Sequence, residues 1–153
     1  MTSERGDAVR QAANGAGLAR GVCRALHQLG YTSLTEFKLG CGRRVDVIGV
    51  DPGGLILIVE IKSSLEDFRA DRKWREYLAY CDHFYFAVPE DFPREVLPED
   101  CGLLVADPYG AAVLREAPPL RLNPTRRRAQ ILRFAHTAAL RLARHTDPRP
   151  ALA

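Results

Sequence analysis

Residues 55–62 read LILIVEIK, and this stretch decides the fold. An almost unbroken run of leucine and β-branched residues is typical of a strand that is covered on both faces. Glu60 and Lys62 stand inside the run, where a charge without a partner costs several kcal/mol. The preceding run, residues 45–50 (VDVIGV), has the same character and carries Asp46. Three charges at the ends of two adjacent buried strands indicate a functional site.

The register of these two strands decides whether the charges meet. Side chains alternate between faces, so Glu60 and Lys62 share one face of their strand. Asp46 joins them if even-numbered residues pair with even-numbered ones, which requires an odd-numbered loop or a bulge around residues 51–54 (DPGG). The alternative is a pair of simple ionic contacts, Glu60 with Lys62 and Asp46 with one of the two arginines before it.

Two carboxylates and a lysine are what a Mg²⁺-dependent phosphodiesterase needs. Mg²⁺ (or Mn²⁺) prefers one or two carboxylates together with waters and phosphate oxygens. Asp46, Glu60 and the backbone carbonyl of Ile61 would supply the protein ligands. The ammonium group of Lys62 would orient the attacking water or stabilise the charge that develops on the phosphate.

Patterns along the rest of the chain predict one mixed α/β domain within residues 1–153, with a core over about 17–115. The strand, helix and strand from residue 55 to residue 88 form a crossover unit, which requires parallel strands within an otherwise antiparallel sheet. The predicted core order is α-β-β-β-α-β, followed by a hairpin and a C-terminal helix. The expected helices cover about 17–29, 66–80 and 124–145, and the expected strands cover 31–39, 45–50, 55–62, 83–88, 102–106 and 111–115.

Composition bounds the setting of this domain. The chain has 153 residues, of which 46% are hydrophobic, and no apolar run approaches the ~20 residues of a membrane span. Residues 1–7 are polar and do not resemble a signal peptide. The four cysteines form no CxxC pair, and the four histidines share no metal-ligand spacing. A reducing cytoplasm therefore fits best, with no membrane partner.

Charge is distributed unevenly along the chain. Residues 1–120 hold 14 Lys and Arg against 18 Asp and Glu, whereas residues 121–153 hold eight arginines and one acid. This tail predicts either a polyanion partner, with Arg126, Arg127 and Arg128 as phosphate contacts, or only a solvated helix face. The expected apolar face of the C-terminal helix consists of Ile131, Leu132, Ala135, Ala138, Ala139 and Leu142.

Several of these segments resemble a known family. Residues 44–47 (RVDV) and 58–64 (IVEIKSS) are similar to the PD-(D/E)xK nuclease superfamily, and residues 66–74 (EDFRADRKW) with 80–82 (YCD) resemble the MmcB family of bacterial DNA repair proteins. The resemblance implies a restriction-endonuclease-like fold and a role in DNA damage repair. It also implies that Asp46 and Glu60 bind metal and that Lys62 is catalytic.

The resemblance leaves the accessory residues open. Nucleases of this type often place substrate contacts on the helix after the lysine, which here carries Asp71, Arg72, Lys73, Trp74 and Tyr77. The alternative is that Arg72 and Lys73 are solvated and that Trp74 lies in the core, and for Trp74 the core position is favoured. Many also carry a glutamate on the first helix, yet residues 18–29 contain no acid. Either Glu36 takes that place, or one metal binds, or catalysis is weak.

Three functions remain in view. The first is Mg²⁺-dependent cleavage of DNA phosphodiesters in repair, with DNA and other repair proteins as partners. The second is a DNA-binding repair factor that keeps the fold without turnover. The third, a module that binds proteins through its aromatic strand 83–88, leaves the buried charges unexplained.

Overall fold

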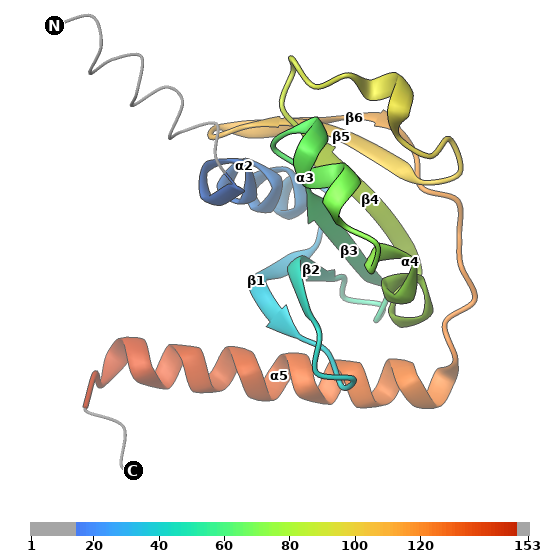
Figure 1. Ribbon diagram of the computed structural model, residues 1–153. Coiled ribbons are helices and arrows are strands. Elements are labelled where there is room, and N and C mark those ends of the chain that lie inside the picture. Colours follow the sequence, from blue (N-terminus) through green and yellow to red (C-terminus); the bar gives the residue numbers. More distant parts are fainter. Residues whose placement is uncertain (1–14, 150–153) are drawn as a thin grey trace, which may run out of the picture.

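The structure is a computed structural model that describes residues 15–149, which form a single α/β domain (Figure 1). The polar segment 1–7 lies outside the described residues. The elements in chain order are α2 (Gly15–Gln28), β1 (Thr32–Lys38), β2 (Arg44–Val50), β3 (Ile56–Ile61), α3 (Leu65–Ala70), α4 (Trp74–Tyr77), the 3-10 turn η1 (Leu78–Tyr80), β4 (His83–Val88), the 3-10 turn η2 (Arg94–Val96), β5 (Gly102–Asp107), β6 (Gly110–Arg115) and α5 (Pro124–Thr146).

The six strands form one mixed sheet in the order β1-β2-β3-β4-β5-β6. β1, β2 and β3 form an antiparallel meander, β4 runs parallel to both β3 and β5, and β6 returns antiparallel to β5. The predicted order of a helix, three strands, a helical segment and a parallel strand is confirmed. It is the order expected of a restriction-endonuclease-like core.

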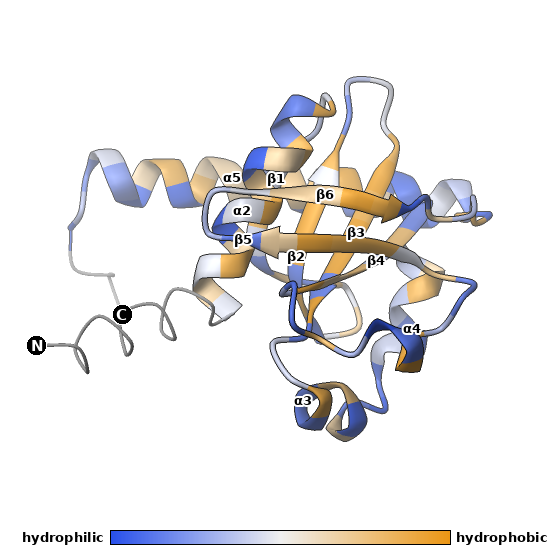
Figure 2. Cartoon of the chain, turned by 90° about the horizontal axis from the view of Figure 1, so that it is seen from above, coloured by the Kyte–Doolittle hydropathy of each residue, from blue (hydrophilic) through white to orange (hydrophobic). Residues whose placement is uncertain are grey.

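Helices cover both faces of this sheet. On one face, α2 buries Leu18 and Val22 against Val47 and Val59. On the other, Trp74 of α4 stacks on Phe84 within a second cluster. Trp74 is 5% exposed, so its predicted core position is confirmed. Figure 2 shows the central strands as the most hydrophobic part of the chain, consistent with a sheet covered on both sides.

A close contact fixes the position of α2. A Cβ atom added at Gly21 would lie 1.7 Å from the carbonyl oxygen of Asp107 and 2.6 Å from that of Gly110. Only glycine therefore lets the helix backbone come this near the turn between β5 and β6. The neighbouring residues Ala19 and Arg20 are held beside the end of β3 by this contact.

The prediction of a continuous helix over residues 66–80 is wrong. Ser64 caps α3, since its hydroxyl accepts a hydrogen bond from the backbone N–H of Asp67. The helix then stops at Asp71, whose backbone is extended, and helical structure resumes at Trp74. At this break the carboxylate of Asp71 pairs with Lys62 at the end of β3, a contact that no local pattern reveals.

The C-terminal helix α5 begins as predicted, with Asn123 accepting hydrogen bonds from two backbone N–H groups. Its predicted apolar face is wrong in part, because Leu132 and Leu142 are 62% and 64% exposed. The inner face instead runs through Gln130 and Phe134, which lie toward the sheet. No helix among residues 15–149 is long and apolar enough to cross a bilayer.

Candidate active site

A cavity of about 620 Å³ opens at the end of β3 where the strand leaves the sheet. Its walls come from α2, β1, β2, β3 and the segment that follows β3. The described residues place four acids and two cations around it. These are Glu36, Asp46, Glu60 and Asp67, with Arg20 and Lys62.

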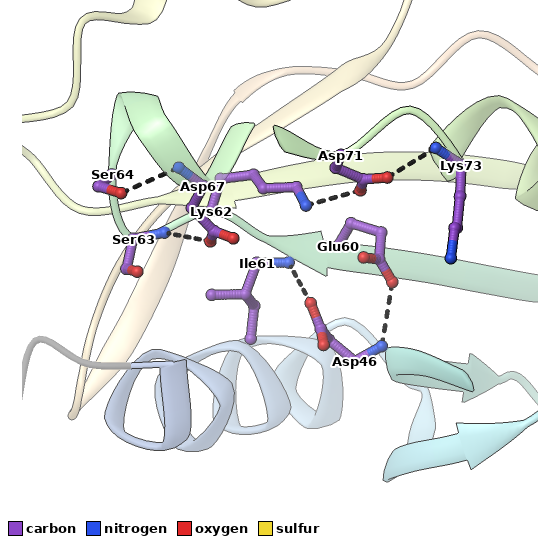
Figure 3. A network of polar contacts seen from close by, with 9 residues as sticks. All are labelled: Asp46, Glu60, Ile61, Lys62, Ser63, Ser64, Asp67, Asp71 and Lys73. Carbon is purple, nitrogen blue, oxygen red and sulfur yellow. Dashed lines mark hydrogen bonds and ion pairs between the residues drawn. The ribbon is translucent and has the colours of Figure 1, made fainter. Parts of the chain in front are cut away.

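The two predicted metal ligands meet across strands β2 and β3 (Figure 3). Ile48 pairs with Ile58, so even residues face even residues, and five residues separate the strands as the prediction required. The carboxylate of Glu60 accepts the backbone N–H of Asp46 at 3.1 Å. The carboxylate of Asp46 accepts the backbone N–H of Ile61 at 2.8 Å. The predicted register is therefore confirmed by direct contacts between the site residues, and the alternative of Asp46 paired with a neighbouring arginine is wrong.

A local irregularity places Asp46 at the cavity. Val45 and Ile48 lie in the same core cluster although they are three residues apart, so the alternation of β2 is interrupted at this point. On the adjoining strand, Glu36 has a left-handed backbone with φ of 48°. Such a backbone is uncommon for a residue with a side chain and indicates a site held by its surroundings.

Burial disfavours the ionised form of both carboxyl groups. Burial, and next the charge of Asp46, raises the pKa of Glu60 to about 8. Burial also raises the pKa of Asp46, although the hydrogen bond from the Ile61 N–H acts in the opposite direction. Two neighbouring acids with raised pKa values form a place where a bound cation would be favourable.

Lys62 lies at the same end of β3 with its side chain 6% exposed. Its ammonium group donates to Asp71 at 2.6 Å, and the other oxygen of Asp71 accepts the backbone N–H of Lys73 at 2.7 Å. Burial alone would raise the pKa of Asp71, but the hydrogen bonds from Lys62 and Lys73 outweigh it and hold that pKa below its ordinary value. The lysine is thus paired with Asp71, which the sequence placed among the substrate contacts of the following helix and not as the partner of Lys62.

The structure places only one of the predicted accessory residues at the cavity. Glu36 lines the cavity and its side chain is exposed there. Arg72 and Lys73 are exposed and do not line it. Arg20 and Asp67 were not predicted as site residues, because neither stands in an apolar run; their helical positions alone gave no signal.

The arginines at the start of α5 make contacts within the protein. Arg127 forms a bidentate ion pair with Asp82 and also donates to the carbonyl of Gly54 at 3.1 Å. Arg126 donates to the carbonyl of Ala79 at 3.0 Å. Arg128 is exposed. Contact of Arg126, Arg127 and Arg128 with DNA stays a prediction, and Arg126 and Arg128 are the members whose exposure suits it.

The donor set bears on the metal prediction. Within residues 15–149, no three His, Cys, Asp or Glu side chains converge closely enough to hold a metal ion by themselves. Asp46 and Glu60 with the carbonyl of Ile61 match the smaller protein share that Mg²⁺ takes when substrate and water complete its shell. Binding of Mg²⁺ or Mn²⁺ stays a prediction.

Comparison with known proteins adds a family. A family model described as MmcB-like, DNA repair protein MmcB-like, matches residues 3–149. A solved structure of a protein of unknown function from Silicibacter pomeroyi is 46% identical, with 91% of this chain and 97% of that chain covered and a TM-score of 0.87. A repair endonuclease from Pyrococcus abyssi is 24% identical over 42% of this chain and 31% of that chain; its TM-score of 0.28 is too low to carry an argument. No curated protein matches the chain.

Proposed function

The chain belongs to the MmcB-like family of DNA repair proteins, and from that premise we propose that it is a Mg²⁺-dependent nuclease that cleaves DNA phosphodiester bonds in the cytoplasm. The observation that carries the proposal is the meeting of Asp46 and Glu60 across β2 and β3, with Lys62 on the same cavity. Burying three charges at one strand end is costly, and a structural role would be served as well by apolar residues. The described cysteines are free thiols, which suits a reducing compartment.

The residues would divide the work by their chemistry. Asp46, Glu60 and the carbonyl of Ile61 would hold the cation, which relieves the repulsion between the two carboxylates. Mg²⁺ supplies water activation and charge neutralisation at the phosphate. Lys62 would donate a hydrogen bond to a phosphate oxygen as its charge develops. Arg20, across the cavity on α2, suits a neighbouring phosphate of the same strand.

The second candidate, a DNA-binding repair factor without turnover, is favoured by the small donor set. α2 carries no acid over residues 15–28, and no third carboxylate joins Asp46 and Glu60 at ligand distance among the described residues. Metal dependence separates the two candidates. A nuclease turns over only with Mg²⁺ or Mn²⁺, whereas a binding factor retains DNA in the presence of a chelator.

The test is cleavage of a panel of duplex, single-stranded, flapped and mismatched DNA with Mn²⁺, Mg²⁺ or chelator. We expect cleavage that needs metal and that Lys62→Ala reduces by about 100- to 1,000-fold, the usual effect of losing one donor to the transition state. DNA affinity should change much less, because the lysine acts on the transition state. Lys38→Ala, which removes an exposed lysine outside the cavity, is the matched control. Equal cleavage by wild type and Lys62→Ala would point to a contaminating nuclease.

A further inference from the structure

Lys62 is a long side chain held in one place inside the protein. Fixing a lysine costs rotamer entropy in addition to the loss of hydration. Among the described residues, its ammonium group has one hydrogen-bond partner, the carboxylate of Asp71 at 2.6 Å. Figure 3 shows the lysine extending from the end of β3 toward Asp71 and passing near Glu60.

We propose that Asp71 is the positioning residue of this site, fixing the ammonium group of Lys62 beside the carboxylates of Asp46 and Glu60. The inference rests on the proposed function, since it names a residue that serves the same cavity. Asp71 does not itself line the cavity. It therefore acts through Lys62 and has no contact with the reacting groups.

The geometry of Asp71 suits this role. Its side chain is 15% exposed, and both carboxylate oxygens are used, one by Lys62 and one by the backbone N–H of Lys73. The acceptor is thereby held rigidly. An ammonium group has three N–H donors, so Asp71 leaves two of them for the cavity.

The helix break supports a role beyond packing. Asp71 ends α3 with φ of −85° and ψ of 112°, and the chain resumes helical structure only at Trp74. α3 buries none of its own residues. A sequence that would otherwise continue as a helix is interrupted where a carboxylate must reach the sheet, and such conflicts between local and global preference concentrate at functional sites.

Two acids closer to Lys62 in sequence, Asp67 and Glu60, do not replace Asp71 as its ion-pair partner. Asp67 lies closer in sequence to Lys62 but accepts the backbone N–H of Ser63 at 3.3 Å and lines the cavity itself. Glu60 accepts the N–H of Asp46. The pairing of Lys62 with Asp71 leaves both of these acids to the cavity side.

The first arm of the test compares Asp71→Asn, Asp71→Glu and the control Asp91→Asn on an exposed aspartate. Asparagine keeps an oxygen for the Lys73 N–H but replaces the charged oxygen that accepts from Lys62 with an amide NH2, which cannot accept a hydrogen bond. We expect Asp71→Asn to lower kcat about 10- to 100-fold, the usual cost of losing an outer partner of a site residue. The KM for DNA should change less than about twofold because ground-state binding is untouched. Asp71→Glu, which restores a carboxylate, should recover part of kcat, which a role in ending the helix would not explain.

The second arm does not depend on activity. The chain has three lysines, Lys38, Lys62 and Lys73, and the first and third are exposed. Reductive methylation read by peptide mass spectrometry should spare Lys62 in the wild type and label it in Asp71→Asn, with the other two as internal references. Equal labelling of Lys62 in both proteins overturns the pairing.

The two experiments distinguish failure of the proposed function from failure of the positioning role of Asp71. A wild type that cuts no DNA with any metal ends the proposed function and the positioning role with it, and the labelling then shows whether the pair is only structural. A wild type that cuts, with Asp71→Asn at full kcat, overturns the positioning role alone.

Discussion

Two buried ion pairs lie at opposite ends of β3, and they differ in how completely they are satisfied. At its start, Asp82 accepts the backbone N–H of Ile56 at 2.8 Å and is held by both arms of the Arg127 guanidinium. At its end, Lys62 pairs with Asp71 beside two carboxyl groups that share a cavity.

The pKa values record the difference. Burial alone would raise the pKa of Asp82, but the hydrogen bonds from Arg127 and Ile56 outweigh it, and the pKa falls below its ordinary value. Burial, and next the charge of Asp46, raises the pKa of Glu60 to about 8, because the hydrogen bond from the Asp46 N–H and the charge of Lys62 do not outweigh them. A saturated pair indicates a structural anchor, and an unsaturated cluster of like charges indicates a site that awaits a ligand.

The strongest way to break the comparison is to remove the anchor. Arg127→Met should lower the free energy of unfolding by about 3–5 kcal/mol, because it leaves the carboxylate of Asp82 buried without its charge partner. Chemical denaturation measures the loss. Arg128→Met, on the exposed neighbour, should change stability by less than about 0.5 kcal/mol. A similar loss of unfolding free energy in the two variants would show that Arg127 contributes no more to stability than an exposed arginine does.

Acid should weaken the same anchor. A carboxyl group whose folded-state pKa is depressed stabilises the fold above its unfolded pKa of about 4 and loses that contribution as pH falls through the folded value. The difference in the free energy of unfolding between wild type and Arg127→Met should therefore have its full size at pH 6 and become smaller below about pH 4.

The opposite pH dependence is expected at the cavity. The folded protein retains the Glu60 proton from the ordinary value of 4.5 up to about 8, so stability falls as pH rises through that window in chelator. Glu60→Gln removes this pH dependence. The free energy of unfolding of Glu60→Gln relative to wild type should increase by up to about 1.4 kcal/mol for each pH unit by which the pH rises within this window. Thermal unfolding at pH 5, 7 and 9 measures it. Added Mg²⁺ should stabilise the wild type and leave Glu60→Gln unchanged; an advantage that does not vary with pH would contradict the assignment.

A smaller effect is expected where α5 meets β1. The guanidinium of Arg141 donates to the carbonyls of Thr35 and Glu36 at 2.6 and 2.9 Å, next to the left-handed residue at the cavity. Arg141→Ala should cost about 0.5–1.5 kcal/mol, the usual net contribution of a hydrogen bond when water can reach the freed carbonyl. Faster hydrogen exchange confined to β1 and α5 would sharpen the result. Arg144→Ala, on the exposed side, is the control.

The smallest effect concerns DNA. Arg128→Gln should flatten the slope of log affinity against log salt by about 0.7–0.9, the value for one lost phosphate contact, and equally for every DNA sequence. Affinity measured across a salt series tests this. An unaltered slope would leave this part of α5 as a solvated face and move the expected contacts to Arg69, Arg72 and Lys73.

The sequence predicted what depends on neighbours along the chain. The apolar runs gave the strands, and the odd-numbered loop gave the even-to-even register that brings Asp46 to Glu60, because both follow from backbone geometry. The interruption of alternation beside Asp46 was not predicted. The break at Asp71 and the rotation of α5 depend on contacts between distant residues. Helix propensity and periodicity carry no information on an ion pair such as Arg127 with Asp82, whose members are 45 positions apart in sequence. The side of α5 that faces the sheet was therefore predicted from apolar residues alone, and Leu132 and Leu142 were placed on the wrong face.

Gly21 has a consequence for how this family can vary. Its missing side chain lets α2 approach the turn between β5 and β6, and Ala19 and Arg20 on the same helix form a wall of the cavity. A single added carbon at position 21 would displace that wall without changing any charged residue. Relatives with a larger residue at this position should therefore have a wider cavity and accept a bulkier substrate, even with every acid and lysine retained.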